Sequence, residues 1–168
     1  PDDPADSTTV EIRTPGPLSK ANTRTSATIG ERFEYLITVP AAPIDVPLYD
    51  VKILDDLSES DGQMRFVGAE AVSGGNLALT NTGGSSTDLV IEDTVTGIDI
   101  PANEQIVIEM TVEQLNTSTN SSGLSFKNRA SYLYNRSNGD DGTQAIGEGD
   151  ITGDMNVVEP QLSAVKTV

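Results

Sequence analysis

Two polar residues fall on the inward side of predicted strands, and both carry groups capable of chemistry. Residues 32–39 and 49–54 alternate apolar and polar side chains with a period of two, which predicts two strands that each bury one face. One further step along the second run places Asp55 on the buried face, and alternation through 124–135 likewise places Asn128 inward. Because a buried carboxylate is costly unless a partner compensates it, Asp55 is the leading chemical candidate and Asn128 the second.

The acidic, glycine-rich segment 136–155 supplies a second group of candidates. Carboxylate and amide oxygens are the ligands that calcium prefers, and glycine permits the tight wrapping that a calcium loop requires. The spacing does not reproduce an EF-hand loop, so a calcium site and a solvated acidic loop both remain open interpretations. The candidate metal ligands are Asn138, Asp140, Asp141, Glu148, Asp150 and Asp154.

The elements that must position these residues are strands. With 15 Gly, 9 Pro and few long amphipathic runs in 168 residues, the sequence predicts one all-β domain, a sandwich of about 8–10 strands. Residues 105–115 show the clearest alternation, and the proline-rich bend between the runs at 32–39 and 49–54 is too long for a tight hairpin, which favours two different sheets. Further strands are expected at 8–14, 64–72, 77–80, 88–93 and 97–100.

Composition excludes several classes of function. The sequence has no Cys and no His, which removes thiol nucleophiles, disulfides, zinc fingers and Ser-His-Asp triads. A formal net charge of −16 disfavours nucleic acids and anionic lipid surfaces as partners. No apolar run is long enough to span a bilayer, so direct membrane insertion is not expected.

Four segments, taken in order, resemble the tandem repeats of bacterial surface and fimbrial proteins, the isopeptide-forming fimbrial domains. They are ATIGERFEYLITVP, LYDVKILDDL, KNRASYLYN and VVEPQLSAVKTV. The resemblance implies an immunoglobulin-like sandwich in which a Lys on the first strand is joined to an Asn on the last strand, assisted by a buried acid. Asp55 matches the acid position and Asn128 the amide position.

The sequence differs from the family pattern at the position of the lysine. Aligning residues 8–14 with the C-terminal PQLSAVK places Thr14 under Lys166, so Thr14 is expected at the family's lysine position and Lys166 in the following repeat. Lys20, beyond the Pro-Gly-Pro break, is then the nearby lysine that could form a cross-link with Asn128. The alternative is that Asp55 and Asn128 make ordinary buried hydrogen bonds.

Three functions follow, of which the first is favoured. It is a non-catalytic spacer repeat of an extracellular bacterial surface adhesin or fimbria-like protein, monomeric in isolation and partnered by neighbouring repeats. The expected organisation is a linker at 1–8, the sandwich at 9–158, and a linker with the first strand of the next repeat at 159–168. The alternatives are a carbohydrate- or protein-binding module and, with least support, a carboxylate-based hydrolase that uses Asp55 and Asp56.

Overall fold

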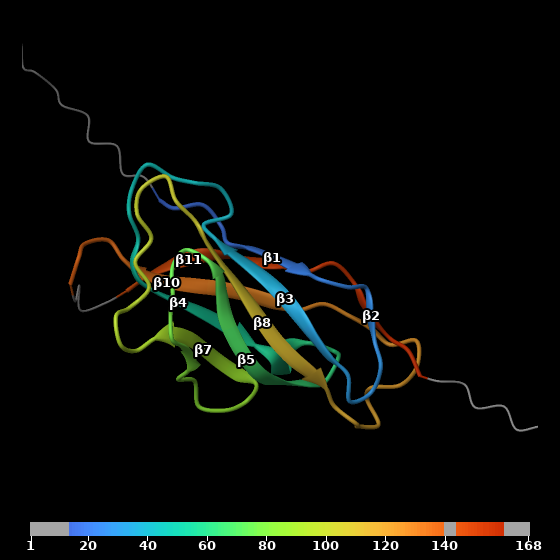
Figure 1. The fold of residues 1–168 in the computed structure, drawn as a ribbon. Coiled ribbons are helices and arrows are strands. Elements are labelled where there is room, and N and C mark those ends of the chain that lie inside the picture. Colours follow the sequence, from blue (N-terminus) through green and yellow to red (C-terminus); the bar gives the residue numbers. More distant parts are fainter. Residues whose placement is uncertain (1–13, 140–143, 160–168) are drawn as a thin grey trace, which may run out of the picture.

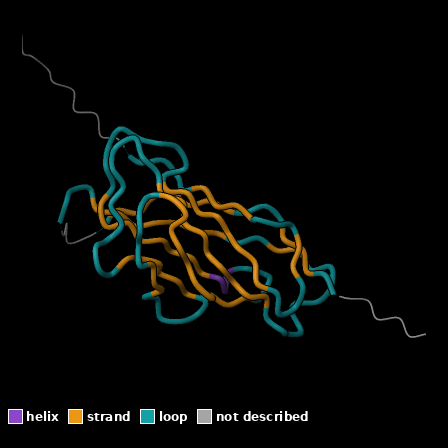
Figure 2. The backbone as a smooth tube through the Cα atoms, viewed as in Figure 1, coloured by secondary structure: helices purple, strands orange, loops and turns teal. Residues whose placement is uncertain are grey.

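Two main antiparallel sheets enclose one hydrophobic core (Figure 1). The computed structural model describes residues 14–139 and 144–159. The first sheet has the strand order β1-β3-β8-β5, the second has the order β11-β10-β4-β7-β6, and a small third sheet has the order β2-β12-β9. Figure 2 shows strands forming the body of the sandwich, with the connecting loops gathered at its two ends.

The strand bounds confirm the all-β prediction. The described residues contain twelve strands, more than the expected 8–10, because the third sheet is built from strands of two or three residues. A 3-10 turn, η1 (Leu57–Glu59), follows β4. The strands are β1 (Ser19–Asn22), β2 (Ser26–Ala27), β3 (Arg32–Val39), β4 (Tyr49–Asp56), β5 (Met64–Ser73), β6 (Leu79–Asn81), β7 (Asp88–Asp93), β8 (Ile106–Gln114), β9 (Ser125–Phe126), β10 (Arg129–Asn135), β11 (Ala145–Ile151) and β12 (Met155–Val157).

Alternation along the central strands determines which side chains form the core. Every second residue of β3 and β8 is buried, and the two strands pair in register along their length, with Ile37 opposite Ile108. The two alternating runs on either side of the proline-rich bend enter different sheets, as predicted, because β3 belongs to the first sheet and β4 to the second. The side chains that these three strands bury include Phe33, Tyr35, Ile37, Val39, Val51, Ile53, Ile106, Ile108, Met110 and Val112.

Strand β1 lies where the two sheets meet. It pairs with β3 in the first sheet, whereas just before it the amide of Leu18 donates to the carbonyl of Glu148 on β11, in the second sheet, at 3.0 Å. The amide of Lys20 donates to the Asp150 carboxylate of the same strand at 3.0 Å. The beginning of the described chain is therefore hydrogen-bonded to both layers of the sandwich.

Two predictions about strands were wrong. Residues 145–151, predicted as part of an acidic loop, form β11, whose backbone pairs with β10 although its side chains do not alternate by polarity. Residues 97–100, predicted as a strand, contribute one isolated bridge between Ile100 and Leu48. The predicted strand at 8–14 lies outside the described residues except for Thr14. The predicted linkers at 1–8 and 159–168 also lie outside them, except for Glu159.

Within residues 14–139 and 144–159, no helix is long and apolar enough to cross a membrane.

Candidate functional site

Three buried polar side chains meet in the core between the two sheets: Lys20, Asp55 and Asn128. Each residue is at most 3% exposed. They come from three separate places in the fold, namely β1, β4 and the two-residue break between β9 and β10. We call these residues the Lys-Asp-Asn cluster.

The backbone register determines the position of Lys20. The short strand β1 pairs with the edge of β3, with Lys20 opposite Ile37, and the exposure of its residues shows that the side chain of Lys20 points inward and that of Ala21 outward. The amine Nζ of Lys20 forms an ion pair with Oδ2 of Asp55 and lies 4.5 Å from the centroid of the Tyr35 ring. An aromatic face is a favourable neighbour for this nitrogen when it is charged, and it keeps solvent away from it.

Asp55 occupies the buried position that follows Val51 and Ile53 on β4, as alternation predicts. Its Oδ2 accepts from the Lys20 amine and from the Asn128 amide nitrogen, the latter at 3.4 Å. Its other oxygen, Oδ1, is buried and has no hydrogen-bond partner among the described residues. One carboxyl oxygen is therefore engaged with both neighbours, while the second is left for a further contact.

Asn128 also points inward, together with Phe126, Ala130, Tyr132 and Tyr134, so the alternation predicted for this segment is confirmed. Its carboxamide nitrogen donates to Asp55, and its Oδ1 is buried without a hydrogen-bond partner in the described part of the chain. Among the described residues, the cluster thus contains two buried oxygens without a hydrogen-bond partner, Asn128 Oδ1 and Asp55 Oδ1.

Burial shifts both titratable groups of the cluster toward their neutral forms. Removal from water lowers the pKa of the Lys20 amine, and the attraction of Asp55 opposes this shift only in part. Removal from water also raises the pKa of the Asp55 carboxyl group, against the opposing effect of Lys20 and the hydrogen bond from Asn128. A neutral amine is a nucleophile and a protonated carboxyl group is a proton donor, so the cluster has the groups needed for amide transfer.

The structure brings together all three residues that the sequence suggested for a cross-link, Lys20, Asp55 and Asn128. Thr14 is exposed and lies away from the cluster, beside a hollow lined by Ile44, Val46 and Asn103. Lys20 is the residue whose strand pairs with β3 and whose side chain enters the core.

The predicted calcium ligands are distributed over several elements. Glu148 and Asp150 lie on β11, and Asp150 accepts backbone amides from Lys20 and Ile151. Asp154 forms an ion pair with Lys127 at 3.7 Å, and Asn138 borders a separate hollow. Asp140 and Asp141 lie outside the described residues. Among the residues that the structure describes, no group of three or more His, Cys, Asp or Glu could hold a metal ion.

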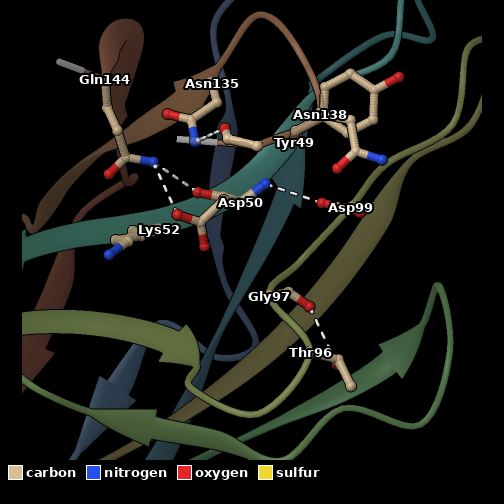
Figure 3. A pocket seen from close by; sticks show the side chains of 10 residues that line it. Tyr49, Asp50, Lys52, Thr96, Gly97, Asp99, Asn135, Asn138 and Gln144 are labelled. Carbon is tan, nitrogen blue, oxygen red and sulfur yellow. Dashed lines mark hydrogen bonds between the residues drawn. The ribbon is translucent and has the colours of Figure 1, made fainter. Parts of the chain in front are cut away.

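A polar hollow of about 580 Å³ lies at the end of β4, on the surface (Figure 3). Asp50, with a positive φ of 45°, donates its amide to Asp99 at 2.9 Å and accepts from the Gln144 side chain through its carbonyl at 2.8 Å. Tyr49 is half-buried at the rim, and Asn135 fixes the adjoining turn by donating to the Gly139 carbonyl at 2.9 Å. No pattern in the sequence predicted this hollow.

Comparisons with known proteins identify similar folds but no related sequence family. No protein-family model matches the sequence, and no curated protein matches it significantly. Among solved structures, a cohesin module from a family 33 glycoside hydrolase of Clostridium perfringens superposes with a TM-score of 0.53 at 9% identity, covering 88% of this chain and 100% of that module.

Domains D2 and D3 of the major pilin SpaD from Corynebacterium diphtheriae superpose with a TM-score of 0.53 at 18% identity over 80% of this chain. The full-length SpaD pilin gives the same TM-score and identity over 82% of this chain. The chain spans about half of the two-domain structure (51%) and about a third of the full-length pilin (34%). At these identities the likeness concerns the fold: this chain is an all-β sandwich of the kind found in pilin domains and cohesin modules.

Proposed function

We propose that this chain is a non-catalytic structural module of a bacterial surface adhesin or pilus-type protein, locked internally by an amide bond between Lys20 and Asn128. The observation that carries the proposal is the Lys-Asp-Asn cluster, in which an amine, a carboxyl group and a carboxamide from distant parts of the chain meet out of contact with solvent. The fold shared with a pilin supports the same role.

The reaction balances without any cofactor. The neutral Lys20 amine attacks Cγ of Asn128 while the Asp55 carboxyl group donates its proton to Oδ1, giving a tetrahedral intermediate. Asp55 then carries a proton from the attacking nitrogen to the leaving amide nitrogen. The C–N bond of the carboxamide then breaks and ammonia leaves. Oδ1 returns its proton to Asp55 as the carbonyl re-forms, and a secondary amide joins the two side chains. Asp55 ends in its starting protonation state, so it acts as a proton shuttle.

The position of this bond suits a module that bears tension. It would tie β1, which belongs to the first sheet, to the segment that enters β10, which belongs to the second. Tension applied at the two ends would then reach a covalent bond in addition to the hydrogen bonds of the strand ladders. We place the module outside the cell, between neighbouring modules of the same polypeptide.

Intact mass spectrometry tests the cross-link. The purified protein is expected to weigh about 17 Da less than its sequence requires, since one ammonia is lost. Digestion should then yield one branched peptide containing Lys20 and Asn128. K20R, D55A and N128A should each restore the full mass, whereas K127R, which alters an exposed lysine, should retain the deficit. A wild-type protein at full mass would reject the cross-link.

Calcium binding by the segment 136–155 is a separate proposal, supported by the number of its oxygen ligands. We expect calcium to raise the thermal midpoint and to release or absorb heat in a titration. Replacing Asp140 and Asp141 together with Asn should remove both effects. Absence of heat and of any shift in the wild-type protein would reject the proposal.

The hollow at Tyr49 and Asp50 supports a second candidate function, the binding of a neutral carbohydrate. Tyr49 is half-buried and lines the hollow beside acid and amide side chains, so its ring can meet a ligand, whereas Tyr132 and Tyr134 are buried in the core. A glycan array with the wild-type protein and Y49A tests this function. Binding that Y49A abolishes would support it, and an array without signal would leave the structural module.

A further inference from the structure

The backbone of Asn128 is not part of a strand ladder. Strand β9 ends at Phe126 and β10 begins at Arg129, so Asn128 lies in the break between them. Its carboxamide makes one long hydrogen bond, 3.4 Å, to Asp55. Neither a ladder nor a strong side-chain contact within the cluster therefore explains how the reacting carbon of Asn128 is held in place.

Thr152 holds this backbone from both sides. The amide of Asn128 donates to Oγ1 of Thr152 at 3.0 Å, and the amide of Thr152 donates to the carbonyl of Asn128 at 2.9 Å. Both residues are only 2% exposed. Thr152 lies just beyond the end of β11, so this pair continues the pairing of β10 with β11 after the regular strands have ended, with a side-chain hydroxyl replacing one carbonyl.

The hydroxyl of Thr152 is itself oriented. It donates to the carbonyl of Gly153 at 2.9 Å, which leaves its lone pairs for the amide of Asn128. The β-branched side chain has few accessible χ1 rotamers, so this oxygen has little freedom to move. The backbone of Asn128, and with it the direction of its Cα–Cβ bond into the cluster, is therefore fixed by one residue on a neighbouring segment.

We infer that Thr152 is the positioning residue of the cross-linking reaction, and that its hydroxyl holds Asn128 where the Lys20 amine can attack. The inference rests on the proposed cross-link and adds to it a residue that touches no reacting atom. Attack on a carboxamide depends steeply on the alignment of nucleophile and carbon, and a displacement of about 1 Å can cost on the order of a hundredfold in rate.

The test measures the rate of ammonia loss in newly made full-length chains. Cell-free synthesis is stopped after a short pulse, and intact mass is followed with time for the wild-type protein and three variants. T152V keeps the shape of the side chain and removes the hydroxyl, whereas T152S keeps the hydroxyl. T28V is the matched control, because it removes a hydroxyl bonded to Glu31 in a loop that has no part in the cluster.

We expect T152V to lose ammonia about ten- to a hundredfold more slowly than the wild-type protein, and T152S and T28V to react close to the wild-type rate. A T152V rate equal to that of the wild-type protein would overturn the inference and leave the cross-link standing. Equal slowing by T152V and T152S, or by T152V and T28V, would also overturn it, since the hydroxyl at this position would then have no specific effect. A wild-type protein that never loses ammonia would remove the cross-link itself.

Discussion

Replacing Asn128 with Ala removes the carboxamide that the proposed cross-link requires. The expected loss in the free energy of unfolding can be worked out from the structure. An amide bond between Lys20 and Asn128 closes a loop of roughly 110 residues, and chain-entropy arguments give a loop of about that size close to 4.7 kcal/mol of stabilisation. The hydrogen bond from Nδ2 of Asn128 to Asp55 adds nothing to this difference, because that nitrogen leaves as ammonia when the cross-link forms. We therefore expect N128A to lose about 5 kcal/mol in the free energy of unfolding and about 10–20 °C in thermal midpoint.

Guanidinium unfolding at neutral pH measures this loss, with intact mass confirming the absence of the bond in N128A. The slope of free energy against denaturant should also rise in N128A, because an unfolded chain without the loop exposes more surface. N156A is the matched control: it removes one side-chain hydrogen bond to Thr25 and should cost less than about 1 kcal/mol. An N128A protein no less stable than N156A, with an unchanged slope, would refute the reasoning.

Two further predictions concern the buried acid and the edge strand. K20M leaves Asp55 without its cation while burial still holds the pKa of that carboxyl group above its ordinary value. The folded protein then keeps a proton that the unfolded chain releases, so thermal midpoints of K20M should fall as pH rises from about 4 to about 8, and those of K20M/D55N should not. G147A places a methyl group against the buried Tyr132 ring and should cost about 1–3 kcal/mol in urea unfolding; G84A, where the methyl group meets no atom within 4 Å, should be nearly neutral. The first prediction would be contradicted if the thermal midpoint of K20M/D55N fell with rising pH as that of K20M does. The second would be contradicted if G147A and G84A changed the free energy of unfolding equally.

The sequence by itself determined the all-β class and the two inward polar residues. Side chains on a strand alternate between faces with a period of two, so the apolar neighbours of Asp55 and Asn128 were enough to predict that both point into the core. The bend between β3 and β4 likewise predicted that the two strands enter different sheets. These features depend on local pattern, which a sequence displays directly.

Only the tertiary structure decided which lysine lies beside Asp55 and Asn128 and which residues surround the cluster. The segment Ser19–Asn22 has no apolar alternation, because its inward residue is Lys20 itself, and it is a strand because the edge of β3 supplies its backbone partners. Strand β11 forms in the same way against β10 despite its glycines and acids. Thr152 gives no sequence signal at all, since its role depends on a hydrogen-bonded pair with a residue 24 positions earlier in the chain. Strand pairing between distant segments creates these contacts, and local side-chain pattern does not encode it.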